Sequence, residues 1–359
     1  MSHTLVIDVR EACRERRTGK GQWTYGFVSE LIRRGQPLHL LSNSPLPSEW
    51  EERAHVRPMV TPVRGSRWHL SMAHNLRRMK DILYVSPTSY IVPSLAGKSM
   101  KSVVIVHDLI AFQNEPHDRR ARWIERLTLG WSLRSATHVC SISEATKKDL
   151  LDRFPSFPAS GVTTIYAGPM REHPPRNQPD GTTILCVATL CPRKNQERLI
   201  LAYRSLPSPL RDRFRLLLGG GRGWKDETII RLARETPGVE WRDSIPDEEY
   251  ERLLSTCTVF ALPSLYEGFG MQILDALQRG IPVLTSDRGS LKEVAGDAAM
   301  FVDPESVPAI AEGLQVLLTN ADFRRKLTLN GPCQAGRFSW DRTVDLFLDQ
   351  VLGSRGRSG

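Results

Sequence analysis

The sequence predicts an α/β protein built from two parallel-sheet domains. The chain has 359 residues, enough for about two domains of ordinary size. In both halves, short apolar runs that suit buried strands alternate with segments of helical spacing. Residues 171–181 (REHPPRNQPDG) are rich in proline and polar side chains and lack an apolar period, which is typical of a linker. We therefore expect a first domain over residues 1–170, a second over 182–340, and a C-terminal helix with a frayed tail over 341–359.

The first half begins with a strand-like run, TLVIDVR, at residues 4–10. Residues 23–35 follow a glycine-containing loop, carry apolar side chains at helical spacing and end at a glycine, so they predict a helix. The run SVVIVHDLI at residues 102–110 is a clear strand that ends at His107. Residues 136–154 predict a strand, a serine cap and a helix.

The second half repeats the alternation of strand and helix. Strands are expected at residues 182–190, 214–220, 239–244, 259–264 and 281–287, with helices at 197–206, 227–236, 247–257 and 270–280. Such alternation favours a parallel sheet covered by helices, and ligands of these sheets bind at the carboxyl ends of strands. We expect the two domains to face each other across a cleft.

Composition is that of an ordinary globular protein, with 40% hydrophobic and 25% charged residues. The N-terminus becomes charged within ten residues, and no run approaches the ~20 apolar residues that span a bilayer. The six cysteines form no C-x-x-C pair and lie near no histidine cluster, so we expect reduced thiols and no metal site. These features predict a cytoplasmic protein and leave attachment to the inner face of the cytoplasmic membrane open.

The net charge of +9 lies entirely in the first half. Residues 1–170 contain 24 lysines and arginines against 15 acidic residues, whereas residues 171–359 contain 25 of each. The excess predicts an anionic partner: a phospholipid surface, a phosphorylated acceptor or nucleic acid. Basic segments with interleaved tryptophan and leucine at residues 67–80 and 119–131 could lie on an anionic membrane, or could be core-packed helices with basic outer faces. No recognition motif accompanies the charge, so nucleic acid is not expected.

The stretch YEGFGMQILD places two acids, Glu267 and Asp275, around the start of the helix expected at residues 270–280. Its two glycines allow a close approach of the backbone to a ligand, and the first N–H groups of a helix favour an anion such as phosphate. Carboxylates near a phosphate site can accept hydrogen bonds from sugar hydroxyls. Asp275 is expected about two turns into the helix. The pattern predicts a pocket for a nucleotide-sugar diphosphate, and a glycine-rich turn with solvent-facing acids is the alternative.

Arg193 and Lys194 follow the strand expected at residues 182–190. Adjacent cations at the carboxyl end of a strand suit a diphosphate, arginine through its planar fork and lysine as a point charge. The glycine run at residues 219–223 lacks the G-x-G-x-x-G spacing into a helix, which disfavours a nicotinamide enzyme, and the P-loop sequence is absent.

Taken together, these segments resemble retaining glycosyltransferases of the GT-B fold, glycosyltransferase family four. The span from Glu267 to Asp275 is similar to the family's E-x7-E signature, and ATLCPRKNQERLILAY, LKEVAGDAAMFVDPES and FSWDRT are similar to its neighbouring segments. Upstream, VVIVHDL resembles its His-Asp strand end and RRTGKGQWTY its first glycine loop. Two positions depart from the pattern: Asp275 stands where the family usually has glutamate, and Lys20 separates two glycines where many relatives have an apolar residue.

The resemblance implies a role for each site residue. Arg193 and Lys194 would neutralise the leaving nucleoside diphosphate without a metal or other cofactor, Glu267 would hold the donor sugar, and Asp275 would hold the ribose. The further donor-binding groups are the backbone N–H groups of Phe269, Gly270 and Met271 and the loop glycines Gly19 and Gly21. His107 would position the donor sugar or the incoming acceptor. Asp108 is the next residue, and either a cap on the following turn or a place in the site is open for it.

The expected reaction moves a hexose from a nucleotide diphosphate sugar to an acceptor hydroxyl with retention of configuration, and the domains close over the donor. The resemblance to mannosyltransferase-type members favours GDP-mannose and a role in surface polysaccharide or lipopolysaccharide synthesis, with a glycan or lipid-linked acceptor. UDP-sugars and dTDP-rhamnose remain alternatives. A nucleotide-sugar epimerase or hydrolase, or a non-catalytic nucleotide-sugar-binding subunit, is an alternative on the same architecture. The C-terminal helix is expected to cross back to the first domain.

Overall fold

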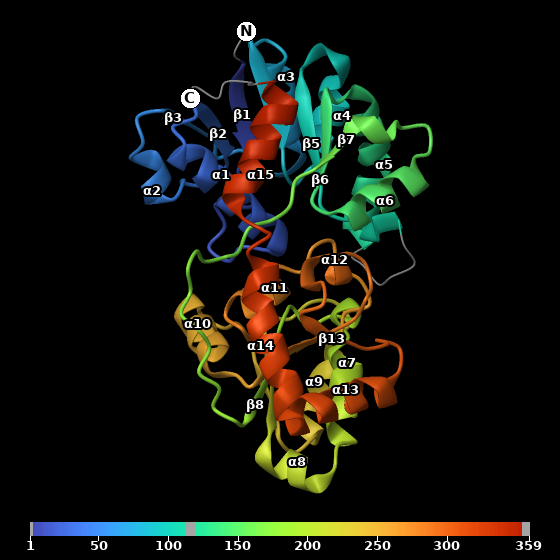
Figure 1. Ribbon diagram of the computed structural model, residues 1–359. Helices are drawn as coiled ribbons and strands as arrows, with labels where there is room; N and C mark the ends of the chain where they lie inside the picture. Colours follow the sequence, from blue (N-terminus) through green and yellow to red (C-terminus); the bar gives the residue numbers. More distant parts are fainter. Residues whose placement is uncertain (1–2, 113–118, 354–359) are drawn as a thin grey trace. The chain divides into compact units, whose positions relative to one another are not determined.

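The computed structural model describes residues 3–112 and 119–353, which form two compact units (Figure 1). Unit 1 comprises Met1–Met170 together with Phe338–Gly359, and unit 2 comprises Arg171–Arg337. Each unit is a parallel sheet with helices packed around it, so the prediction of two parallel-sheet α/β domains is confirmed.

Unit 1 contains a seven-stranded parallel sheet in the order β3-β2-β1-β4-β5-β6-β7. The strands are β1 (Thr4–Asp8), β2 (Leu38–Ser42), β3 (Val56–Val60), β4 (Ile82–Ser86), β5 (Ser102–Val106), β6 (His138–Ser141) and β7 (Val162–Thr164). The helices are α1 (Gly19–Arg33), α2 (Ser48–Glu51), α3 (Gly65–Leu76), α4 (Ile91–Ala96), α5 (Arg119–Ser135), α6 (Glu144–Arg153) and α15 (Trp340–Phe347). The central strands β4 and β5 are buried along their whole length, which explains why their sequences are continuous apolar runs.

Unit 2 contains a six-stranded parallel sheet in the order β10-β9-β8-β11-β12-β13. Its strands are β8 (Thr183–Val187), β9 (Arg215–Gly219), β10 (Val239–Arg242), β11 (Val259–Leu262), β12 (Val283–Thr285) and β13 (Ala299–Phe301). Its helices are α7 (Gln196–Arg204), α8 (Ser208–Arg213), α9 (Glu227–Glu235), α10 (Asp247–Thr256), α11 (Met271–Gln278), α12 (Leu291–Ala295), α13 (Val307–Thr319) and α14 (Ala321–Ala335). The strand order reverses between β8 and β11, so loops after these two neighbouring strands meet at the switch point of the sheet.

Residues 171–181, which the sequence suggested as a linker, pack on unit 2. The backbone N–H of Asn177 donates to the carbonyl of Arg279 (3.0 Å), and its side-chain amide donates to the carbonyl of Leu254 (2.8 Å). Asp180 accepts hydrogen bonds from the backbone N–H and the hydroxyl of Thr183. The polar side chains of this segment therefore satisfy backbone and strand-end groups of unit 2, and the division between the units lies at residues 170 and 171.

The chain returns to unit 1 at Phe338, where α15 lies beside α1 (Figure 1). The ring of Trp340 meets that of Trp23 edge-on at 5.9 Å, and its indole N–H donates to the carbonyl of Pro169 (2.9 Å). A Cβ atom on Gly26 of α1 would collide with the Trp340 ring, so this glycine makes room for the indole.

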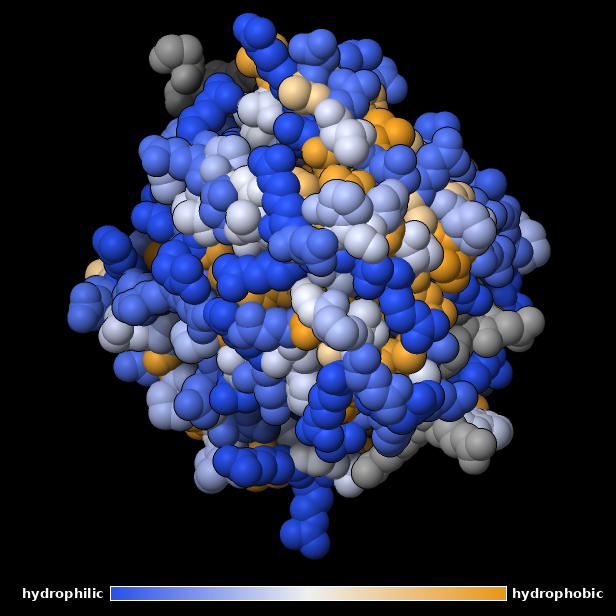
Figure 2. All heavy atoms as spheres, turned by 90° about the horizontal axis from the view of Figure 1, so that it is seen from below, coloured by the Kyte–Doolittle hydropathy of each residue, from blue (hydrophilic) through white to orange (hydrophobic). Residues whose placement is uncertain are grey.

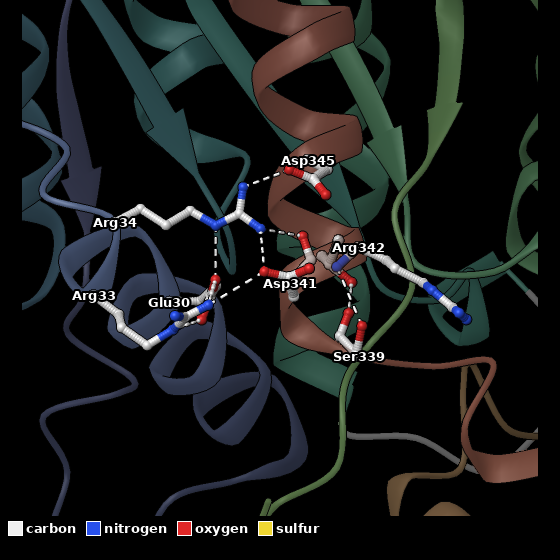
Figure 3. A network of polar contacts seen from close by, with 8 residues as sticks. Glu30, Arg33, Arg34, Ser339, Asp341, Arg342 and Asp345 are labelled. Carbon is white, nitrogen blue, oxygen red and sulfur yellow. Dashed lines mark hydrogen bonds and ion pairs between the residues drawn. The ribbon is translucent and has the colours of Figure 1, made fainter. Parts of the chain in front are cut away.

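A network of charges joins the outer sides of the same two helices (Figure 3). Arg34, directly after α1, donates to the buried Glu30 (2.7 Å) and to Asp341 of α15 (2.6 Å), and also pairs with Asp345. The C-terminal helix is thus held by aromatic packing on one side and ion pairs on the other. Figure 2 shows one face of the whole molecule, on which hydrophilic side chains predominate.

Candidate nucleotide-sugar site

The turn that carries Arg193 and Lys194 follows β8. Residues Pro192–Lys194 form a short 3-10 turn, and Asn195 then adopts a left-handed conformation (φ 62°) before α7 begins. The Asn195 amide donates to the carbonyls of Pro263 (2.9 Å) and Pro304 (2.7 Å). These bonds tie the cation-bearing turn to the loop after β11, at the switch point of unit 2, and to the loop after β13.

Glu267 lies in the loop after β11 and binds both cations. Arg193 Nη1 donates to Glu267 Oε2 (2.7 Å) and Lys194 Nζ to Oε1 (2.6 Å), while the Ser264 hydroxyl also donates to Oε1 (2.7 Å). Glu267 and Lys194 are only 6% and 7% exposed. Burial alone would raise the pKa of Glu267, but the charges of Arg193 and Lys194 and the hydrogen bonds lower it to about 2. The cluster therefore holds two positive charges and one negative charge.

The backbone of this loop is fixed on its other side by the residues after β12. The N–H and the hydroxyl of Ser290 both donate to the carbonyl of Glu267 (3.1 Å each). Gly289 has a φ of +58°, and a Cβ atom there would collide with the Glu267 backbone. A glycine at this position therefore lets the two loops pack directly against each other.

Gly270 precedes α11 with a φ of +94°, a conformation that glycine adopts readily. The helix begins at Met271, so its first N–H groups lie a few residues from Glu267 in the same loop. The side chains of Phe269 and Met271 are buried, at 3% and 8% exposure, and pack into unit 2. The role of their backbone N–H groups toward a ligand stays a prediction.

Asp275 is the fifth residue of α11, so it lies about one turn into the helix and not the two turns expected from the sequence. The helix starts at Met271, after the glycine loop, which shortens that distance. Asp275 is 1% exposed and accepts a hydrogen bond from the Tyr250 hydroxyl of α10 (3.1 Å). Burial, together with the charge of Asp275, raises the pKa of Tyr250 well above its ordinary value, so Tyr250 remains a phenol donor. A ribose contact of Asp275 stays a prediction.

Sequence reasoning did not find Tyr250, Ser264 or Asn195 as parts of the site. Ser264 lies three residues before Glu267, and its position at the end of β11 was a signal that could have identified it. Tyr250 is separated from Asp275 by 25 positions and lies in a helix whose pattern is simply amphipathic, so its pairing had no sequence signal.

The remaining predicted residues, His107, Gly19 and Gly21, belong to unit 1. His107 follows β5, and its Nε2 lies 2.8 Å from the carbonyl of Pro87, to which it donates as the neutral Nε2–H tautomer. Burial first, and then the charge of Lys20, lower the pKa of His107 to about 3. His107 is therefore neutral at physiological pH, and its ring stacks edge-on against Trp23 at 5.3 Å.

Gly19, Lys20 and Gly21, which the sequence placed in a loop before the helix, instead form the first turn of α1, and Thr18 caps it by accepting from the N–H of Gly21 (3.2 Å). A Cβ atom on Gly21 would collide with the carbonyl of Glu11, whereas one on Gly19 would meet nothing within 4 Å. Lys20 between them pairs with Glu125 (3.2 Å) and Asp108 (3.9 Å). Close packing against Glu11 thus explains why residue 21 is a glycine. The space beside Gly19 is open and leaves room for a ligand.

The structure brings Arg193, Lys194 and Glu267 into direct contact and places Gly270 and Met271 in the continuation of the same loop. Within residues 3–112 and 119–353, no group of three or more His, Cys, Asp or Glu side chains is arranged to hold a metal ion. Over those same residues, no helix has the length and apolar character needed to cross a membrane.

Comparisons with known proteins agree with this arrangement. Residues 171–333 match the family described as "Glycosyl transferases group 1", and residues 18–168 match "Glycosyltransferase Family 4". The chain is 32% identical over 284 residues to the O-antigen chain mannosyltransferase B of Escherichia coli, an alignment that covers 74% of this chain and 73% of that protein. It is 36% identical over 173 residues to the serotype-specific mannosyltransferase WbdA of Escherichia coli, over 46% of this chain and 21% of that protein.

Among solved structures, HepE from Anabaena in complex with UDP and glucose superposes on the chain with a TM-score of 0.75. The superposition covers 98% of this chain and 100% of that chain at 17% sequence identity. At this identity the likeness establishes the fold, which is the GT-B glycosyltransferase architecture.

Proposed function

The chain belongs to glycosyltransferase family four, and we propose that it is a retaining mannosyltransferase that moves mannose from GDP-mannose to a hydroxyl group of a growing surface polysaccharide or lipid-linked glycan. The observation that carries the proposal is the contact of Arg193, Lys194 and Glu267 at the switch point of unit 2. The similarity to an O-antigen chain mannosyltransferase supports mannose as the transferred sugar.

The cation pair of Arg193 and Lys194 suits a diphosphate leaving group. As the bond between the sugar and the phosphate breaks, negative charge grows on the phosphate oxygen, and preorganised cations stabilise that charge most strongly in a site with little water. Lys194 is buried and the Arg193 side chain is 13% exposed, so both charges act in such a site. The first N–H groups of α11 add further donors for the diphosphate.

Glu267 is suited to orienting the sugar and poorly suited to attacking it. Its carboxylate is bound by two cations and a serine hydroxyl, and its pKa of about 2 makes it a weak base and a weak nucleophile. Its remaining lone pairs can accept hydrogen bonds from sugar hydroxyls.

We propose substitution on one face of the sugar. The bond from C1 to the diphosphate breaks, the acceptor oxygen bonds to C1 on the same face, and the acceptor proton moves to the leaving phosphate oxygen. The α configuration of the donor is then kept in the product. We further propose that Arg193 and Lys194 supply the positive charge that a divalent metal supplies in other sugar transferases, so that transfer continues in EDTA.

Thermal unfolding with GDP, UDP and dTDP, each with and without magnesium, tests the donor. A nucleotide at 100 times its Kd adds about 2.7 kcal/mol to the free energy of unfolding. For a domain of the size of unit 2 that corresponds to a rise of roughly 5–10 °C in Tm. We expect GDP to give this rise independently of magnesium. A rise in Tm with UDP alone would mean that the donor is a UDP-sugar and not GDP-mannose. The complex of HepE with UDP supports this alternative.

Variants of unit 2 locate the binding. Lys194→Ala should abolish the rise with GDP, while Lys292→Ala, an exposed lysine on α12, should leave it unchanged. Incubation with GDP-mannose and mannose oligosaccharides should then yield a product whose anomeric carbon NMR coupling is that of an α-linkage. A β-linked product would refute retention, and release of free mannose without transfer to any acceptor would indicate a hydrolase.

A further inference from the structure

Helix α5 exposes an apolar face to solvent. Trp123 is 68% exposed, Leu127 60% and Trp131 65%, and Ile124 beside them is 38% exposed. The first three are spaced by four residues, so all four side chains lie within about 100° of the helix circumference. These four residues are called the apolar face of α5 below.

This face is distinct from the side of α5 that packs into unit 1. Leu129 and Leu133 lie on the opposite side, are 1% and 4% exposed, and join the core around β5 and β6. Exposed tryptophan is rare in folded proteins, and two tryptophans on one face form a patch of the kind that marks an interaction site.

The other basic segment singled out in the sequence behaves differently. In α3, the apolar residues Trp68, Met72 and Leu76 are buried in the core of unit 1, and Leu70 alone among the large apolar side chains of that helix is markedly exposed, at 58%. Of the two segments, α3 is therefore a core-packed helix, whereas α5 leaves an apolar face without a partner in this chain's described residues.

The charges on α5 complement an anionic surface. The helix sequence contains five arginines against one glutamate. That glutamate, Glu125, is turned toward α1, where it pairs with Lys20 (3.2 Å). Arg134 lies in the last turn with its guanidinium carbon 5.4 Å from the centre of the Trp131 ring. Arg122 and Arg126 donate to the carbonyl of Ala111, so among the described side chains Arg134 is the cation beside the apolar face, and the one carboxylate is held away from it.

We propose that α5 docks flat on a lipid bilayer that contains anionic lipids, with Trp123, Leu127 and Trp131 inserted among the headgroups. Tryptophan favours this depth because its ring is apolar and its N–H remains near water, and arginine favours the adjacent phosphates. Two tryptophans on a helix whose sequence carries five arginines and one glutamate suit an anionic phospholipid surface, where the rings lie at headgroup depth and the cations meet the phosphates.

The side of α5 away from the apolar face is held against the start of α1. Glu125 of α5 pairs with Lys20 of α1 (3.2 Å), so this contact fixes α5 on unit 1 while the apolar face stays turned to solvent. The docking proposal does not depend on the proposed function.

Sedimentation with vesicles tests the docking. Vesicles of phosphatidylcholine mixed with phosphatidylglycerol should carry the full-length protein down, and vesicles of phosphatidylcholine alone should do so much less. Replacing Trp123, Leu127 and Trp131 together by alanine should lower the partition coefficient about tenfold or more. Leu329→Ala on α14 (64% exposed) and Leu70→Ala on α3 are matched controls that should bind as the parent protein does.

Fluorescence quenching adds a readout that depends on depth. Brominated lipids should quench the emission of the parent protein, and this quenching should largely disappear in the Trp123→Phe, Trp131→Phe variant, which keeps an apolar face. Equal sedimentation of the triple alanine variant, or failure of the parent protein to bind either vesicle, would overturn the proposal. Self-association that the triple variant loses, without vesicle binding, would instead assign the face to a second copy of the chain. Nucleotide binding at unit 2 would be unaffected by any of these outcomes.

Discussion

Replacing Glu267 by glutamine removes one negative charge from a buried cluster and leaves both cations in place. Glu267 accepts from Arg193 at 2.7 Å and from Lys194 at 2.6 Å, and the side chain of Lys194 is 8% exposed. Glutamine has nearly the same shape, so the change isolates the charge from the packing. We expect this variant to fold and to be markedly less stable.

The size of the effect follows from the pKa of Glu267. Its fall from 4.5 to about 2 corresponds to about 3 kcal/mol of stabilisation at neutral pH. Because the folded-state pKa lies below that of the unfolded chain, this stabilisation is complete above about pH 4.5 and is lost as the pH falls toward about 2. Removing one partner of a buried ion pair costs about 3–5 kcal/mol, which agrees with that value.

Thermal unfolding at neutral pH measures the loss. For a domain of this size about 3 kcal/mol lowers Tm by roughly 6–12 °C. The matched control is Glu235→Gln, whose carboxylate is 56% exposed and pairs with Arg231, and which should change the stability by less than about 0.5 kcal/mol. The difference in stability between the parent protein and Glu267→Gln should shrink as the pH is lowered below 4.5.

A nucleoside diphosphate separates this reasoning from a simple packing defect. If the loss comes from uncompensated cations, GDP should raise the Tm of Glu267→Gln at least as much as that of the parent protein, because the diphosphate replaces the missing anion. Sugar transfer should remain low, since the sugar-orienting carboxylate is gone. A Tm within about 1 °C of the parent protein would show that the ion pairs contribute no net stability and would refute the argument.

Two further predictions concern single contacts. Tyr250→Phe removes the hydroxyl that donates to Asp275 and should cost about 1.5–3 kcal/mol in urea unfolding, because the acceptor is a buried carboxylate; no measurable change would mean that the bond is of no consequence. Gly19→Ala should leave the thermal stability unchanged but lower kcat/KM for the donor, and equal activity of this variant and the parent protein would remove Gly19 from the site. By contrast, the added methyl group of Gly26→Ala would collide with Trp340 and should destabilise the protein by about 1–3 kcal/mol.

The architecture was predictable because buried parallel strands are continuous apolar runs, as in β5 and β8. The positions of the glycine-rich and basic segments were predictable as well, since they directly follow β8 and β11; that they bind a ligand stays a prediction. The contacts that each side chain makes could not be predicted from the sequence. Glu267 meets Lys194 across 73 positions, and nothing in either segment specifies that contact. The segment at residues 171–181 begins where the two units divide, but its hydrogen bonds to unit 2 could not be predicted from its composition.

The sequence also could not assign the two sides of α5. An amphipathic pattern with tryptophans and leucines on several faces permits either a buried or an exposed tryptophan pair. The outcome depends on which side α4 and the sheet of unit 1 cover, and they cover Leu129 and Leu133. Tertiary packing alone decides which side of α5 is buried. An exposed binding face on a helix is therefore harder to predict from the sequence than the position of a loop at the end of a strand.

The presence of an acid within a diphosphate site has a physical explanation in the charges of the cluster. In the structure Glu267 neutralises one of the two cations, which makes their burial tolerable. A bound nucleotide-sugar diphosphate carries about two negative charges, enough to satisfy Arg193 and Lys194 by itself. The carboxylate would then be released toward donors, and sugar hydroxyls are the donors that the substrate brings. Under the proposed function one acid would thus have two roles: it stabilises the buried cations and, once the diphosphate displaces it, would orient the sugar.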